Sequence, residues 1–171
     1  ILLCNIPIKN KSKIKKALKT IGYDSLNDIN EIQRHALACP ALPLCGLAMT
    51  EAERILPEVL NRIEKLLNNM RIEKTILFRM TGCPNGCTRP YMAELALVGS
   101  GQNKYQLWLG GSKNLQRLAK PYLQRMALED LEKTLQPLLE CWKENSTDID
   151  FGDFINSQKD SEIINLLNMH E

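Results

Sequence analysis

The segment TGCPNGCTRP, residues 81–90, places two thiols, Cys83 and Cys87, directly after a short apolar run. A second pair, Cys39 and Cys45, lies upstream in the segment ACPALPLCG, residues 38–46. Proline fixes φ and removes a backbone donor, and glycine and asparagine favour turns, so both segments are predicted to be stiff loops. Four thiols on two stiff loops predict a metal or cluster site.

Three interpretations of the four cysteines remain open from spacing alone. Structural zinc favours close cysteine pairs in small loop-rich modules, whereas here a predicted helix and strand separate the two pairs. An iron–sulfur cube takes its ligands from several directions, and its sulfurs accept hydrogen bonds from loop N–H groups. The third interpretation is that the thiols bind nothing and fill the core. The remaining cysteines, Cys4 and Cys141, lie on apolar patterns and are predicted to be small core residues.

Composition excludes several classes of protein. The net charge is +2, and no basic run is interleaved with aromatic residues, so nucleic acid is not an expected partner. The apolar runs are too short for a membrane helix, and no secretory signal is visible. Ample aliphatic residues argue against a disulfide framework and favour reduced thiols. Because the chain opens without Met on the strand-like ILLCNIP, we expect a fragment whose N-terminal part is missing.

The first third of the chain is predicted to be a strand, a helix and a linker. Residues 1–8 read as a strand, and Ser12 is expected to cap a helix that stops at Gly22. The lysines between residues 9 and 19 are interpreted as the solvated face of that helix. The polar residues 23–30 mark a linker or domain boundary.

The remainder predicts an α+β fold in which helices flank a mixed sheet. Thr50 and Glu53 form a capping box ahead of a helix over 51–67, kinked at Pro57. Strands are expected over 75–80, 95–98 and 105–109, the last two joined as a hairpin through residues 99–101. Helical structure is expected over 113–143, interrupted by Pro137, followed by an irregular arm over 146–171.

Two blocks of this sequence resemble the signature blocks of the sirohaem and iron–sulfur sulfite/nitrite reductase family. They are ACPALPLC, residues 38–45, and TGCPNGCTRPYMAE, residues 81–94. The similarity continues through EAER at 51–54, the hairpin at 105–111 and FGDF at 151–154, so it covers nearly the whole chain. The ferredoxin-dependent sulfite reductase branch is the most similar, and the expected part is its C-terminal portion.

The resemblance implies a set of site residues. Cys39, Cys45, Cys83 and Cys87 would ligate one [4Fe-4S] cluster, and Cys87 would also bind the sirohaem iron, which makes it the catalytic residue of this portion. Asn85 would hydrogen-bond the macrocycle, although a plain turn role explains an asparagine there equally well.

The resemblance also implies the reaction and the partners. Sulfite is reduced to sulfide with six electrons from ferredoxin, and the chain alone is expected to be inactive because the distal anion-binding lysines and arginines belong to the missing N-terminal half. The rival hypotheses are a ferredoxin-nitrite reductase of the same family and a non-catalytic metal-binding module. The glycine in the Asn85-Gly86-Cys87 sequence favours sulfite over nitrite.

Domain organisation and location follow from the same resemblance. Residues 1–24 are expected to end a preceding ferredoxin-like domain, 31–145 to form the sirohaem and [4Fe-4S] domain, and 146–171 to form a C-terminal arm. The expected location is the cytoplasm of a cyanobacterium-like cell or the plastid stroma.

Charged residues near the two blocks are weaker candidates. Arg34, Arg79, Arg89 and Lys113 are placed to pair with macrocycle carboxylates, but ordinary ion pairing is the simpler interpretation. His35 is interpreted as a structural histidine rather than a proton donor.

Overall fold

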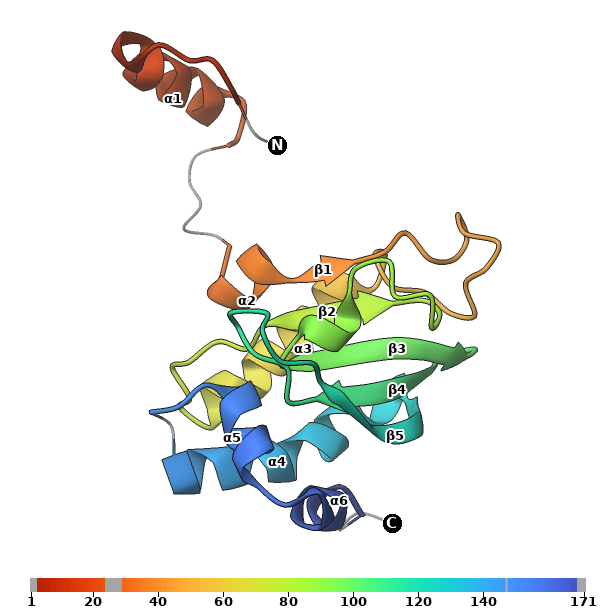
Figure 1. Cartoon of the computed structure of the whole chain (residues 1–171). Coiled ribbons are helices and arrows are strands. Elements are labelled where there is room, and N and C mark those ends of the chain that lie inside the picture. Colours follow the sequence, from red (N-terminus) through yellow and green to blue (C-terminus); the bar gives the residue numbers. More distant parts are fainter. Residues whose placement is uncertain (1–2, 24–28, 147, 169–171) are drawn as a thin grey trace. The chain divides into compact units, whose positions relative to one another are not determined.

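The computed structural model describes residues 3–23, 29–146 and 148–168. The chain divides into two compact units, Ile1–Asn30 and Glu31–Glu171 (Figure 1). Both predicted cysteine pairs lie in the second unit, which also holds the sheet.

The first unit is helical. A 3-10 turn, η1 (Ile8–Asn10), leads into α1 (Lys11–Thr20), and Gly22 follows with a φ of +89°. The predicted helix is therefore confirmed, but the predicted cap at Ser12 is wrong, because the helix starts at Lys11 and Ser12 lies within its first turn. The strand predicted over 1–8 is wrong for residues 3–8, because a strand needs a neighbour to pair with and the described part of this unit has none.

A five-stranded mixed sheet organises the second unit. Its order is β1 (Leu37–Ala38), β2 (Phe78–Thr81), β3 (Leu95–Gly101), β4 (Lys104–Leu109) and β5 (Lys120–Ala127). The first three strands are mutually parallel, whereas β3, β4 and β5 pair antiparallel. The predicted α+β class and mixed sheet are confirmed. The hairpin turns at residues 102–103 rather than at the glycines, because β3 continues to Gly101.

Strand β5 was predicted to be helical, which is wrong. In its sequence KPYLQRMA the apolar residues are interrupted by Gln124 and Arg125 and preceded by Lys120 and Pro121, so it lacks the continuous apolar run by which a buried strand is recognised. β5 forms the edge of the sheet, where proline is tolerated since one side of the strand has no ladder to complete.

Helices α3 (Leu56–Asn69) and α4 (Leu131–Ser146) cover one face of the sheet (Figure 1). The apolar stripe of α3 is buried as predicted, at Val59, Leu60, Ile63 and Leu67. It packs into a core with the inward side chains of β4, which alternate in burial along the strand. No helix in the described residues is both long and apolar enough to cross a membrane.

The start of α3 differs from the prediction because the capping box does not form. Thr50 shares a hydrogen bond with the Tyr105 hydroxyl at 3.0 Å and accepts another from the Asn103 N–H at 3.2 Å. Because the Thr50 hydroxyl binds the β3–β4 hairpin, it does not cap the N-terminus of a helix. Pro57 lies in the first turn of α3, where proline needs no partner for its missing N–H, and so it begins the helix rather than kinking it.

The C-terminal segment is helical rather than irregular. α4 runs through Pro137 without a break, and α5 (Phe151–Ser157) and α6 (Asp160–Asn168) follow. Phe151 packs edge-on against Trp142 of α4, with ring centroids 5.2 Å apart, and both rings are fully buried. Large buried aromatic surface explains why this segment folds onto the core.

A buried carboxylate holds α5 at the amino ends of β2 and β3. Glu94 is fully buried and accepts hydrogen bonds from the N–H groups of Leu77, at 2.8 Å, and Gly152, at 2.9 Å. A Cβ on Gly152 would lie 1.8 Å from the carbonyl oxygen of Gly111, so only glycine fits this approach. We call Glu94, Gly111 and Gly152 the carboxylate end of the sheet.

Candidate metal and cofactor site

The two cysteine pairs lie on loops that follow neighbouring parallel strands. β1 pairs with β2 in the register Leu37 to Arg79 and Ala38 to Met80. Cys39 follows β1 directly, and its N–H still donates to the Met80 carbonyl at 3.2 Å, whereas Cys83 follows the end of β2. Because both strands point the same way, the first cysteine of each pair leaves the sheet at the same edge. We call the loops at residues 39–55 and 82–90 the cysteine end of the sheet.

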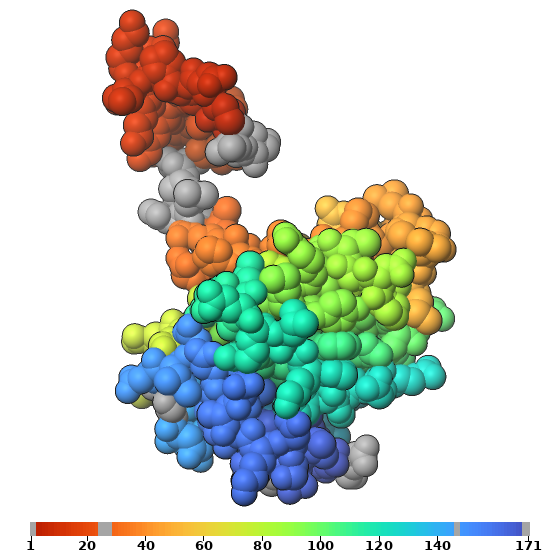
Figure 2. Space-filling view, viewed as in Figure 1, coloured from red at the N-terminus to blue at the C-terminus, as the bar shows by residue number. Residues whose placement is uncertain are grey.

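Backbone contacts join the two loops at Gly82. The Gly82 carbonyl accepts from Met49 N–H at 2.8 Å and from Thr50 N–H at 3.3 Å. A Cβ on Gly82 would lie 2.6 Å from the Cβ of Ala41 and 2.7 Å from the Thr50 carbonyl oxygen, so glycine permits this approach. In Figure 2 the orange loop after β1 and the green loop after β2 accordingly lie side by side on the surface.

Gly82 also provides a direct contact to sulfur. Its N–H donates to the Sγ of Cys39 at 3.3 Å. An N–H group aimed at sulfur stabilises negative charge on a thiolate or on a cluster bound to it, and this is how protein loops tune such centres.

Side-chain hydrogen bonds add to the backbone hydrogen bonds that hold the Cys87 loop. One guanidinium nitrogen of Arg79 donates to the carbonyls of Thr88 and Arg89, at 3.1 and 3.0 Å. The Thr88 hydroxyl donates to the Met80 carbonyl at 3.2 Å, and the Tyr91 hydroxyl donates to the Pro84 carbonyl at 2.6 Å. Burial raises the pKa of the Tyr91 hydroxyl, which keeps it protonated as a donor.

The four thiols range from buried to exposed. Cys39 and Cys83 are each 7% exposed, Cys45 is half-buried and Cys87 is exposed. All four are free thiols. Asn85 is exposed at the tip of the Cys87 loop, where no hydrogen bond of its side chain is seen among the described residues.

The four cysteine thiols suit a metal cluster of several ions better than a single metal ion. Within residues 3–23, 29–146 and 148–168, no three cysteine, histidine or carboxylate side chains approach closely enough to hold a single metal ion. Thiolate ligands on a cube bind different irons and therefore stand further apart. Four thiols at one edge of the sheet, with an N–H already directed at one sulfur, are compatible with such a cluster.

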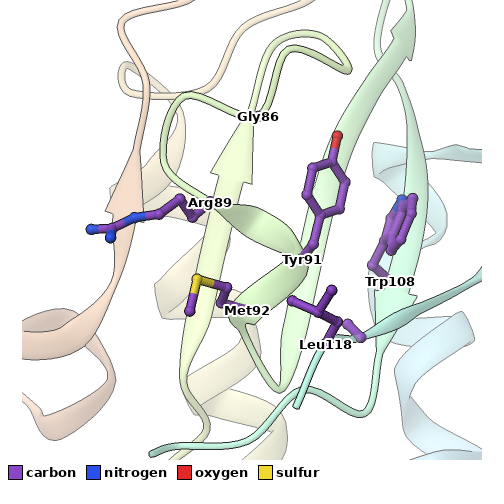
Figure 3. Close-up of a pocket in the computed structure, with 7 residues that line it drawn as sticks. Gly86, Arg89, Tyr91, Met92, Trp108 and Leu118 are labelled. Atoms are coloured by element: carbon purple, nitrogen blue, oxygen red, sulfur yellow. The ribbon is translucent and has the colours of Figure 1, made fainter. Parts of the chain in front are cut away.

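An apolar cavity of about 430 Å³ opens beside the Cys87 loop (Figure 3). Tyr91 and Trp108 form its aromatic wall, with ring centroids 4.5 Å apart at an interplanar angle of 58°. The remaining lining residues are Gly86, Arg89, Met92, Leu118 and Ala119. An aromatic, largely apolar hollow suits a flat conjugated ligand.

The cavity was not predicted, although its signal was present in the sequence. Along β4, Tyr105, Leu107 and Leu109 are buried, while Trp108 occupies the intervening, less buried row. Tryptophan is a large apolar residue at a position that the strand alternation assigns to the outer face, and so it is a signal in the sequence for an apolar hollow on that face.

The charged candidates are mostly paired on the surface. Arg34 pairs with Glu31 at 2.6 Å, His35 lies 3.8 Å from the same carboxylate, and Lys113 pairs with Asp150 at 2.9 Å. These contacts fit the ordinary ion pairing and structural roles that were the simpler interpretations. Arg79 and Arg89 are the exceptions, because no ion pair of either is seen in the part of the chain that the structure describes: Arg79 is buried within the site, and Arg89 is exposed and lines the cavity.

The two cysteines outside the pairs, Cys4 and Cys141, differ in burial. Cys141 on α4 is partly buried and packs against the core, as predicted. Cys4 is exposed in the first unit, which contradicts its predicted place in a core. Without the strand expected at residues 1–8, no second layer covers Cys4 in the described part of that unit.

Comparison with known proteins supports the predicted resemblance. No protein-family model matches the chain. The chain is 48% identical, over 90% of its length, to a Synechococcus elongatus protein named sulfite reductase (ferredoxin), of which it covers 25%. It is 39% identical, over 91% of its length, to the NADPH sulfite reductase hemoprotein beta-component of Oceanobacillus iheyensis, of which it covers 27%. The chain thus spans about a quarter of the length of these relatives.

A solved structure supports the fold. The NirA protein of Mycobacterium tuberculosis matches 93% of this chain and 31% of its own, with a TM-score of 0.71 and 17% sequence identity. At that identity the likeness establishes the arrangement of sheet and helices. The resemblance predicted from the two cysteine blocks and the predicted fold class are both confirmed.

Proposed function

We propose that this chain, which is similar to about a quarter of the length of known sulfite reductases, supplies the cofactor-holding part of such an enzyme. Cys39, Cys45, Cys83 and Cys87 would hold a [4Fe-4S] cluster, and Cys87 would also bind a sirohaem iron. The observation that carries the proposal is the meeting of both cysteine loops at one sheet edge, beside an aromatic cavity.

The burial of the thiols fits different roles for them. Cys39 and Cys83 are buried, so a centre held by them is shielded from water on the protein side. Cys87 is exposed on the loop that borders the cavity through Gly86, and so it is the thiol placed to reach a second group lying there. The Tyr91 and Trp108 rings provide an apolar surface for a macrocycle beside it.

When bound, the two groups would pass six electrons from the electron donor to sulfite, which is converted to sulfide while protons are taken up and the three oxygens leave as water. The chain's own residues bind and orient these groups and keep water away from the buried thiols. Anion binding and proton delivery to sulfite are assigned to residues outside this chain, and so turnover by the chain alone is not expected.

Ferredoxin is the proposed electron donor. The relative named for ferredoxin is 48% identical to this chain, whereas those named for NADPH are 37–42% identical. The test replaces the matching segment of the Synechococcus enzyme with this chain and compares sulfite turnover driven by ferredoxin and by NADPH. If the exchanged enzyme reduced nitrite faster than sulfite, that result would contradict the proposed substrate and favour the alternative of a nitrite reductase.

Metal analysis of the anaerobically purified and reconstituted chain tests the ligands directly. We expect about four irons and matching acid-labile sulfide per chain. Cys87→Ser should lose most of this iron, because one corner of the cluster loses its thiolate. Cys141→Ser is the matched control and should keep it, since Cys141 lies on α4 and packs against the core.

Two outcomes would contradict the assignment. Stoichiometric zinc without labile sulfide would indicate the non-catalytic metal-binding module. Loss of iron in Cys141→Ser, with Cys87→Ser unaffected, would show that the four cysteines are not the ligands.

A further inference from the structure

Arg79 is a buried cation at the centre of the sheet. It lies in the middle of β2 and is 5% exposed. Its register neighbours are Leu37 on β1 and Ala96 on β3, and Ala96 is in turn paired with Trp108 on β4. Paired residues share a face of a sheet, so Arg79, Ala96 and Trp108 lie on the face opposite α3 and α4. This is the face on which the Cys87 loop and the aromatic cavity lie.

Arg79 has no acidic partner among the described residues. Arginine is rarely buried without a carboxylate, because removing its charge from water is costly unless that charge is compensated. One terminal nitrogen binds the Thr88 and Arg89 carbonyls, whereas its buried Nε makes no hydrogen bond. Burial lowers the pKa of Arg79, and the like charge of Arg89 lowers it further.

The two carbonyls that Arg79 binds directly follow Cys87. They belong to a short turn in which Arg89 has a left-handed φ of +53° and its N–H donates to the Gly86 carbonyl at 2.7 Å. A non-glycine residue in that conformation needs support from its surroundings. The guanidinium, which presents several donors in a fixed plane, provides that support from beneath.

We propose that Arg79 is a positioning residue for Cys87: it anchors the two peptide groups after Cys87 to the centre of the sheet and places a buried positive charge beneath the loop that carries Cys87. The first half of this proposal rests on the geometry of the chain alone. The second half rests on the proposed function, because the anion that compensates Arg79 is then the negatively charged cluster and its thiolates.

Hydrogen exchange in the cofactor-free chain tests the anchoring. In Arg79→Met, the Arg89 and Met92 amides should exchange about tenfold faster or more, because two charge-assisted hydrogen bonds to the turn are lost. Arg79→Lys keeps a charged donor and should be intermediate. Arg125→Met, which removes an exposed arginine from β5 of the same sheet, should leave both amides unchanged.

The reduction potential of the reconstituted cluster tests the charge. Arg79→Met should lower the midpoint potential, because a nearby positive charge stabilises the added electron, and Arg79→Lys should restore it. A residue that only filled space would give the same potential in the Lys and Met variants. Equal potentials in these two variants would therefore overturn the electrostatic role.

The outcomes separate this inference from the proposed function. Unchanged exchange of the two amides in Arg79→Met overturns the anchoring role, whatever the chain binds. If the wild-type chain takes up no cluster, the proposed function fails, whereas the exchange measurement still decides the anchoring. If Arg79→Met does not fold, exchange in Arg79→Lys decides it, because a wild-type rate there would show that the contact of one guanidinium nitrogen with both carbonyls is not needed.

Discussion

Opposite charges are buried beneath the cysteine end and at the carboxylate end of the sheet. From β2, Arg79 donates to two carbonyls of the Cys87 loop, whereas at the carboxylate end Glu94 accepts from the N–H groups of Leu77 and Gly152. Both side chains are at most 5% exposed. Each charge matches the backbone groups left unpaired near it, since buried peptide carbonyls need donors and buried N–H groups need acceptors.

The two ends differ in whether their buried polar groups already have partners within the chain. At the carboxylate end the buried groups satisfy one another and fix α5 to the sheet. At the cysteine end the Gly82 N–H points at sulfur and the Arg79 Nε has no partner in the described part of the chain. One end is therefore closed within the chain, whereas the other still offers donors and positive charge to a bound group.

The largest expected effect comes from breaking the carboxylate end. Gly152→Ala would place a Cβ 1.8 Å from the Gly111 carbonyl oxygen, which requires backbone to move. We expect the free energy of unfolding to fall by about 3–5 kcal/mol, measured by urea denaturation of the chain. Gly101→Ala is the control, because its nearest new contact would be an ordinary 3.6 Å, and a comparable loss there would refute the steric reason.

A smaller loss of stability is expected from breaking the cysteine end. In Gly82→Ala the new Cβ meets Ala41 and the Thr50 carbonyl at 2.6 and 2.7 Å, so the two loops must separate. We expect a loss of about 2–3 kcal/mol in urea denaturation together with reduced iron uptake, since the loops carry the thiols. Gly46→Ala lies in the first loop with nothing within 4 Å of its Cβ and should change neither. Normal iron uptake by Gly82→Ala would show that the close approach is not needed for the site.

The smallest expected effect is a dependence on pH that comes from Glu94. Burial raises the pKa of Glu94 above its ordinary value of 4.5, against the opposing effect of the two N–H groups. The folded chain therefore holds this proton more tightly than the unfolded chain. The contribution of Glu94 to stability is complete below the ordinary pKa and declines as pH rises through the raised one.

Glu94→Gln isolates this contribution. The amide cannot titrate and accepts only one of the two N–H bonds, so the variant should be less stable at pH 4, by about 1–2 kcal/mol, and the deficit should narrow as pH rises. Thermal unfolding of both proteins from pH 4 to 8 measures it. Glu132→Gln should show the opposite trend, because Arg62 lowers the pKa of Glu132 and that stabilisation is lost as pH falls. A deficit for Glu94→Gln that widens with pH would contradict the burial argument.

Local patterns predicted those elements whose own residues bury an apolar face. The helix over 51–67 was recognised because its apolar residues, among them Val59, Leu60 and Ile63, repeat with the helical period, and the strand over 105–109 was recognised from the hairpin signal that precedes it. β5 and α5 were missed, because β5 is an edge strand without a continuous apolar run and α5 is held in part by the Gly152 N–H, which donates to the Glu94 carboxylate from a distant part of the sequence.

By itself, the sequence determined that four thiols lie on two stiff loops and resemble the blocks of sulfite reductases, since thiol spacing and turn residues are local properties. Only the tertiary structure decided that both loops leave one edge of a parallel sheet, that Tyr91 and Trp108 form a cavity beside Cys87, and that Arg79 lies buried beneath its loop. These relations join residues from β1, β2 and β4, and strand pairing brings them together through contacts that no single segment encodes.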